Sequence, residues 1–132
     1  MTAFSNYLEN KILEHTLKGA TNPYTPPTTI YIGLFTSSLG ETGGGNEIST
    51  SGSAYARQSV AFGTVTSGSV SNSNTILFST ATSNWGTITQ IGLFDAATGG
   101  NLLYYGSVVT SKTVSIGDTF SISPGNLTIT LD

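Results

Sequence analysis

The segment from Trp85 to Gly106 constrains the fold most, because it has the pattern of two β-strands joined by a tight turn. Its first half alternates with the period of two that marks a pleated strand. One face carries Trp85, Thr87, Thr89, Ile91 and Leu93, and the other carries Ile88, Gln90, Gly92 and Phe94. Both faces are largely apolar, so we expect this hairpin to lie centrally in a sheet.

The turn of the hairpin is predicted at residues 95–101. Gly99 and Gly100 can adopt positive φ, and Asp95 and Asn101 can bond nearby backbone groups. Leu102 to Thr110 then forms the returning strand.

Further strands are predicted at a spacing of about ten residues, which is typical of antiparallel sandwiches. They cover residues 30–36, 55–63, 75–79, 113–116, 120–123 and 127–131. The pentapeptides 31–35 and 90–94 both end in Ile-Gly-Leu-Phe, which either marks equivalent strands in two halves or is a coincidence. The predicted fold class is mainly β: a single antiparallel β-sandwich or jelly-roll domain over residues 30–132, with one N-terminal α-helix.

The one helix is predicted over Thr2–Lys18, because Phe4, Leu8 and Ile12 recur at every fourth position. Gly19 is a natural C-terminal stop. Two interpretations stay open: the apolar face covers one opening of the sandwich, or residues 1–19 form an arm that docks on a neighbouring subunit. Residues 20–29 contain three prolines and are predicted to be a stiff connector.

The N-cap of this helix is either Ser5 or Asn6. With Asn6 as the cap, Glu9 stands where a capping box places its acidic residue.

A long loop is predicted over residues 37–53, where Glu41 and Glu47 are the only carboxylates. Arg57, the only arginine, follows in the next strand. A bidentate partner such as Glu47 or Asp95 would fix the loop to the sandwich, whereas a solvent-facing strand arginine is the alternative.

Charged residues make up 8% of the 132-residue chain, and the net charge is −3. The four cationic residues form no run, so we expect no nucleic-acid partner. The chain has no cysteine, no apolar stretch long enough for a membrane span, and no signal-peptide pattern at residues 1–9. We therefore expect no disulfide, no membrane association, and no export by the general secretory route.

Catalytic groups are scarce. His15 is the only histidine and lies in the predicted helix, far from any expected Ser-His-Asp arrangement. Glu41, Glu47, Asp95 and Asp118 all fall in turns or loops, and Asp95 with Asn101 matches no EF-hand spacing. We expect no enzyme, no catalytic residues, no metal site and no cofactor.

Three segments resemble a known family: Asn46-Glu-Ile with Ala54-Tyr-Ala-Arg-Gln58, then residues 84–106, and finally residues 124–131. They are similar to short virion proteins of tailed bacteriophages that are usually described as tail fibre proteins. Where relatives often carry a run of glycines before Tyr-Ala-Arg-Gln, this chain has Ser51-Gly-Ser53. The resemblance implies a structural role in the virion, assembled in the host cytoplasm, and supplies no catalytic residues.

Two functions follow as hypotheses. The first is a capsid decoration (cement) protein that contacts the major capsid protein, since one compact sandwich with a helical arm has the size of a capsid clamp. The alternative is a short tail-fibre or baseplate protein that recognises host glycans. A homotrimer is expected, because an uncharged surface packs with little desolvation of charge. The predicted subunit or virion contacts are Phe4, Leu8, Ile12, Glu41, Glu47 and Arg57.

Overall fold

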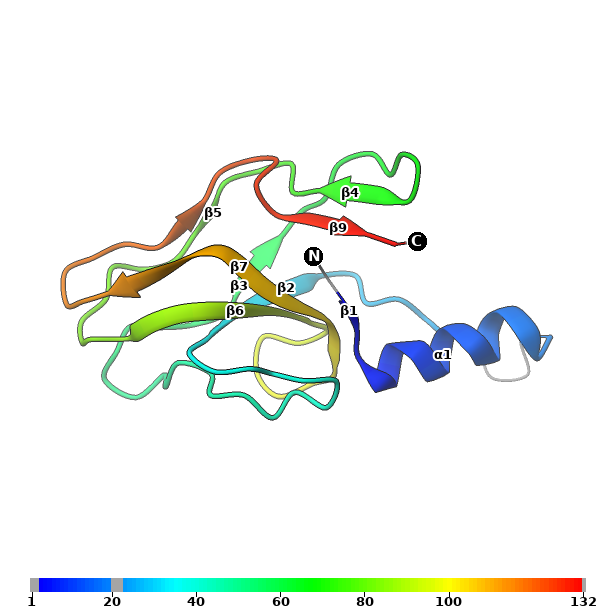
Figure 1. Cartoon of the computed structure of the whole chain (residues 1–132), viewed down its shortest axis with the longest axis horizontal. Helices are drawn as coiled ribbons and strands as arrows, with labels where there is room; N and C mark the ends of the chain where they lie inside the picture. Colours follow the sequence, from blue (N-terminus) through cyan, green and yellow to red (C-terminus); the bar gives the residue numbers. More distant parts are fainter. Residues whose placement is uncertain (1–2, 20–22, 132) are drawn as a thin grey trace.

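The computed structural model describes residues 3–19 and 23–131. Its elements, drawn in Figure 1, are β1 (Ala3–Phe4), α1 (Asn6–Leu17), β2 (Ile30–Phe35), β3 (Gln58–Val60), β4 (Ser69–Ser71), β5 (Ile76–Leu77), β6 (Gly86–Phe94), β7 (Leu102–Val114), β8 (Ser121–Ile122) and β9 (Thr128–Thr130). No helix within these residues is long and apolar enough to cross a membrane.

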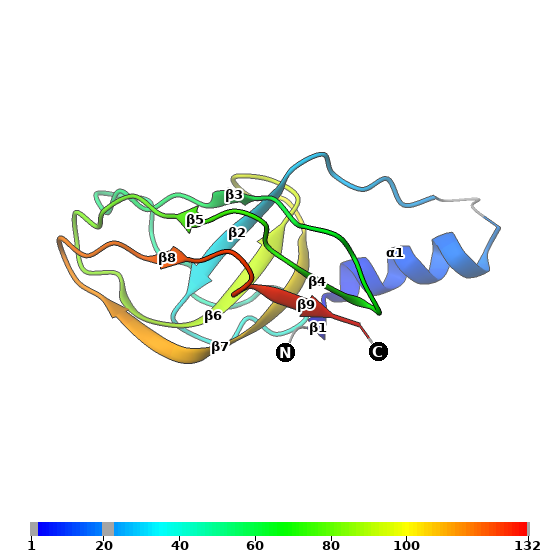
Figure 2. The same cartoon turned by 90° about the horizontal axis from the view of Figure 1, so that it is seen from above.

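The strands form a sandwich of one large sheet and two short ribbons. The sheet has the antiparallel order β1-β7-β6-β2-β3, and the ribbons are β4–β9 and β5–β8 (Figures 1 and 2). The predicted fold class, a mainly β sandwich with one N-terminal helix, is confirmed. The central position of the hairpin is also confirmed, because β6 is the middle strand and pairs with β7 and β2.

The core between the layers is built around aromatic rings. Trp85 is 5% exposed and contacts Tyr55 and Phe78 edge to face, with ring centroids 5.5 and 6.5 Å apart. Phe120 packs edge to face on Phe78 at 5.8 Å. The indole Nε1 of Trp85 donates a hydrogen bond of 2.9 Å to the carbonyl of Ser53, so Trp85 also holds the end of the long loop.

A large bulge interrupts the β6–β7 pairing. Ile88 is opposite Lys112 but Gln90 is opposite Ser107, so Thr89 stands against residues 108–111. The bulge moves Ile88 onto the face of Trp85, Ile91 and Leu93, where it is fully buried. The prediction that Ile88 faces the other way is therefore wrong. The bulge also joins the two strands predicted at 102–110 and 113–116 into one.

The repeated pentapeptides lie side by side in the sheet. Tyr31 is opposite Phe94 and Phe35 is opposite Gln90, so Gly33 faces Gly92 at the centre. The strands are thus related by a local twofold axis. Phe35 and Phe94 stack 6.0 Å apart and form, with Leu39 and Leu102, a second apolar cluster on the far side of the sheet from Trp85.

The strand predicted at 55–63 is shortened to β3, Gln58–Val60. Residues 55–57 cannot extend the pairing of β3 with β2, because the backbone groups of Leu34 have other partners. The Leu34 carbonyl accepts from the Ile48 N–H at 3.1 Å. The Leu34 N–H donates to the Tyr55 hydroxyl at 3.0 Å. Loop residues therefore occupy the positions that a longer strand would need.

Candidate functional site

The N-terminal arm, residues 3–19, is fixed to the sheet at its base. Its first residues are not helical as predicted but form β1, which pairs with Tyr104 and Tyr105 of β7. Ser5 is the N-cap, and its hydroxyl oxygen accepts from the Leu8 N–H at 3.2 Å. The Ser5 hydroxyl also donates to the Leu102 carbonyl, and the Ser5 N–H donates to the Leu103 carbonyl at 2.9 Å. Because Ser5 takes the cap, the capping box of Asn6 with Glu9 does not form.

Three of the predicted contact residues gather at this base. The Phe4 ring packs edge to face on Tyr104 at 5.2 Å, and Leu8 is 2% exposed. The Asn6 N–H donates to the Glu41 carbonyl at 3.2 Å, which brings the loop against the start of the helix.

The outer part of the arm projects from the body (Figures 1 and 2). Ile12 is half-buried, whereas Leu13 and Leu17 are 54% and 76% exposed. The helix ends at Leu17, and Gly19 follows with the positive φ expected of a C-terminal stop. Within the described part of the connector, residues 23–29, the Tyr24 N–H donates to His15 Nδ1 at 3.2 Å. The outer part of the helix thus lies outside the sandwich, and its docking on a neighbouring subunit stays a prediction.

Arg57 joins the long loop, the sheet and the central turn. Its Nε and Nη2 donate to the two carboxylate oxygens of Glu47, both at 2.8 Å. Its Nη1 donates to the carbonyls of Ala96 and Gly99 at 3.0 and 2.8 Å, and its guanidinium lies 3.6 Å from the centre of the Phe94 ring. The bidentate partner predicted for Arg57 is therefore present and is Glu47.

Tyr55 completes this cluster. Its hydroxyl donates to Glu47 Oε1 at 2.8 Å while accepting from the Leu34 N–H. Burial, followed by the charge of Glu47, raises the pKa of Tyr55 above its usual value, so the hydroxyl stays protonated. A Cβ atom at Gly33 would lie 2.9 Å from Glu47 Oε1, so only glycine leaves room for this carboxylate.

The six predicted contact residues thus fall into two places. Phe4, Leu8 and Ile12 belong to the arm with Glu41 at its base, while Glu47 and Arg57 bond one another inside the fold. Their roles as subunit or virion contacts stay predictions. Sequence reasoning missed the Tyr55 hydroxyl, although the Tyr-Ala-Arg spacing places Tyr55 and Arg57 on one side of an extended chain.

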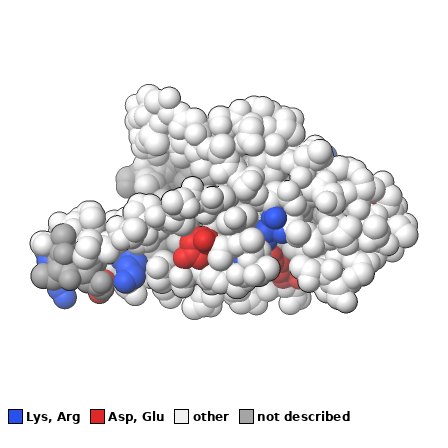
Figure 3. All heavy atoms as spheres, turned by 180° about the vertical axis from the view of Figure 1, so that it is seen from behind, with Lys and Arg blue, Asp and Glu red and all other residues white. Residues whose placement is uncertain are grey.

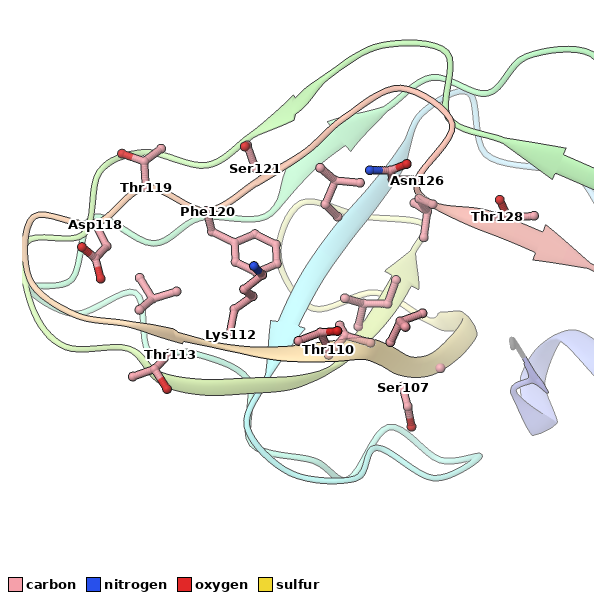
Figure 4. A pocket seen from close by; sticks show the side chains of 17 residues that line it. Ser107, Thr110, Lys112, Thr113, Asp118, Thr119, Phe120, Ser121, Asn126 and Thr128 are labelled. Carbon is pink, nitrogen blue, oxygen red and sulfur yellow. The ribbon is translucent and has the colours of Figure 1, made fainter.

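An open groove lies between β7 and the segment that carries β8 and β9 (Figure 4). Its volume is about 810 Å³. Its lining combines the apolar Val108, Val109 and Phe120 with many hydroxyl groups, and Lys112 extends into it from β7. Val109, at the bulge, is fully exposed. Sequence reasoning did not find the groove, because the bulge that shapes it leaves no local signal.

Charged side chains are few and scattered on the face shown in Figure 3. Asp95 accepts from the backbone and side chain of Asn101 at 2.7 and 2.9 Å, and Asp118 accepts from the Ser115 N–H at 2.9 Å. Both carboxylates therefore stabilise turns by accepting hydrogen bonds within them. Residues 3–19 and 23–131 contain no group of three or more His, Cys, Asp or Glu side chains that could hold a metal ion.

Comparison with protein families finds a match over nearly the whole chain. The family model described as Podophage GP4 fiber I protein gp80 matches residues 3–130. The match thus includes both the arm and the sandwich. A comparison with curated proteins finds no match.

Proposed function

Because the chain belongs to the family of Podophage GP4 fiber I protein gp80, we propose that it is a structural subunit of the podophage tail fibre, held by its arm. The family is one of phage fibre proteins, so the chain is a virion component. This finding favours the alternative hypothesis of the sequence analysis. Capsid decoration, the first hypothesis, gains no support from the family.

The observation that carries the attachment role is the projecting part of α1. Two large apolar side chains, Leu13 and Leu17, stand four residues apart and face solvent on an element whose base is fixed by Ser5 and Leu8. An apolar pair presented on a helix is a common anchor for a partner groove. The body has its own core without them.

Glycan recognition stays a prediction. Sugar-binding sites often use an exposed aromatic ring as a stacking surface. In the described part of the chain every Phe, Tyr and Trp side chain is buried or half-buried. The attachment role is therefore the function that the surface supports best.

The test is a phage that carries Leu13→Ser together with Leu17→Ser. We expect purified virions to lose most of this protein, measured by quantitative mass spectrometry against the major virion proteins. The matched control is Leu77→Ser, which changes a leucine 59% exposed on the body and should leave the copy number unchanged. Normal incorporation of the arm variant would show that the arm is not the attachment element.

The same measurement on wild-type virions addresses location. A copy number in the range of a few per tail fits a fibre subunit. Hundreds of copies per virion would instead indicate that the protein belongs to the capsid, and would overturn the proposal.

A further inference from the structure

We infer that the outer face of α1 in one copy docks into the β7–β8 groove of a second copy, so that the copies associate head to tail. The inference rests on the proposed role of the arm and goes further, because it names the partner surface.

The outer face of α1 carries four uncharged side chains. Asn6, Asn10, Leu13 and Leu17 follow one another at spacings of four, three and four residues, which places them on one side of a helix. All four are exposed. Leu8 is buried against the body, and His15 bonds the connector. The side that carries Leu13 and Leu17 is therefore the side available to a partner.

Charged residues flank this face. Helical geometry places Glu9 on one flank and Glu14, followed one turn later by Lys18, on the other, and turns Lys11 away from the face. A partner that meets the leucines therefore also meets the Glu9 carboxylate on one flank.

The groove offers the matching features. Among the described residues that line it, Lys112 is the only cation, is exposed, and extends into the groove (Figure 4). Asp118 is the only acidic residue among them, and its carboxylate accepts from the Ser115 N–H. Val109, which is fully exposed, and Val108, which is half-buried, provide apolar surface for the two leucines, and the rest of the lining is mostly hydroxyl and amide. Apolar anchors and one charge pair thus match across the contact.

The contact must join different copies. The arm is fixed where β7 begins, at Tyr104 and Tyr105, and projects away from the body. The groove follows the later part of β7, from Gly106 to Val114. A chain therefore cannot fill its own groove. A contact between two unlike surfaces produces a ring or a filament when it repeats.

Two other occupants fit the structure less well. Parallel pairing of two arms through their leucines would place Glu9 of one helix against Glu14 of the next, and like charges repel there. Addition of a foreign strand to β7 is opposed by its bulge and by Lys112, features that protect exposed sheet edges from pairing.

The chain has no cysteine, so engineered disulfides give a clean test. Full-length protein with Leu17→Cys and Val109→Cys should form a ladder of covalent oligomers, or a closed ring, under mild oxidation at high concentration. Protein with Leu17→Cys and Leu77→Cys is the matched control and should cross-link at least tenfold more slowly. Equal cross-linking of both pairs, or dimers from Leu17→Cys alone at the same rate, would overturn the inference.

A charge exchange tests the same contact without cysteine. Lys112→Glu should weaken self-association at least tenfold by analytical ultracentrifugation, with an unchanged circular dichroism spectrum. Mixing it with a chain that carries Glu9→Lys and Glu14→Lys should restore hetero-association. If no restoration occurs, the arm does not meet Lys112 and the inference fails.

Failure here is distinguishable from failure of the proposed function. A wild-type chain that stays monomeric and does not cross-link, while the leucine variants still lose incorporation into virions, would mean that the arm binds another virion protein. That result overturns the head-to-tail contact and leaves the attachment role in place.

Discussion

At the scale of single residues, Trp85 is the side chain on which the core depends most. It contacts two aromatic rings and bonds the Ser53 carbonyl. We expect Trp85→Ala to lower the free energy of unfolding by about 3–5 kcal/mol, because it leaves a cavity and an unpaired carbonyl. Chemical denaturation measures this. Leu77→Ala, at an exposed site, should stay within about 0.5 kcal/mol of wild type; a similar midpoint for both variants would contradict the prediction.

The Tyr55 hydroxyl gives a pH dependence. Its pKa is raised in the folded state, chiefly by burial, above the usual value near 10. The folded protein therefore holds a proton that the unfolded chain releases at high pH, so this contribution to stability is complete below pH 10 and declines as the pH rises above it.

We expect Tyr55→Phe to cost about 1–2 kcal/mol at neutral pH, because the Leu34 N–H and Glu47 lose a partner. The variant should also lose less stability than wild type between pH 9 and pH 11, a window set by the usual tyrosine pKa near 10. Denaturant titrations at these pH values provide the measurement. If the free energy of unfolding fell equally with pH in both proteins, ionisation of Tyr55 would not be the cause of the loss of stability at alkaline pH.

At the scale of elements, Arg57 holds the long loop to the central turn. Arg57→Lys keeps the charge but cannot bond Glu47 at two points while reaching Ala96 and Gly99. We expect a loss of about 2–3 kcal/mol. Hydrogen exchange should speed up in residues 37–57 and 95–101 together. Faster exchange in only one of the two segments would contradict the prediction that Arg57 stabilises both.

The twofold pairing of β2 and β6 depends on glycine at its centre. A Cβ atom at Gly92 would lie 2.9 Å from the Phe94 ring and 3.0 Å from Leu102. We expect Gly92→Ala to cost about 1–3 kcal/mol through this crowding. Gly44→Ala is the control, because its Cβ would meet no atom closer than 4.0 Å. Thermal denaturation compares the two variants.

At the scale of the whole molecule, the expected homotrimer stays a prediction. Three copies that each place an arm in the next groove would close a ring without leaving a free arm. Sedimentation equilibrium should then give three times the chain mass of 13.7 kDa. A monomer at all concentrations would contradict the trimer, and larger open assemblies would indicate a filament instead.

Removal of residues 1–19 is a severe test of the arm, because it also removes Ser5 and Leu8 from the body. The structure shows why point changes at Leu13 and Leu17 are the better test, since they leave the base of the arm intact.

The sequence by itself determined the local features. Alternation specified the central hairpin, Gly99 and Gly100 its turn, and Gly19 the end of the helix, because each depends on side chains or φ angles within a few residues. It also gave Glu47 and Asp95 as candidate partners of Arg57, beside the alternative of a solvent-facing arginine, and the structure shows Glu47 as the partner.

Only the tertiary structure decided what depends on distant segments. The bulge that buries Ile88 and opens the groove comes from a difference in length between two paired strands, which neither strand encodes alone. Likewise, Ser5 became the helix cap because Leu102 and Leu103 lie beside it, 97 residues along the chain in the case of Leu102. Contacts of this kind are fixed by the packing of the whole sheet, and so they could not be predicted from local pattern.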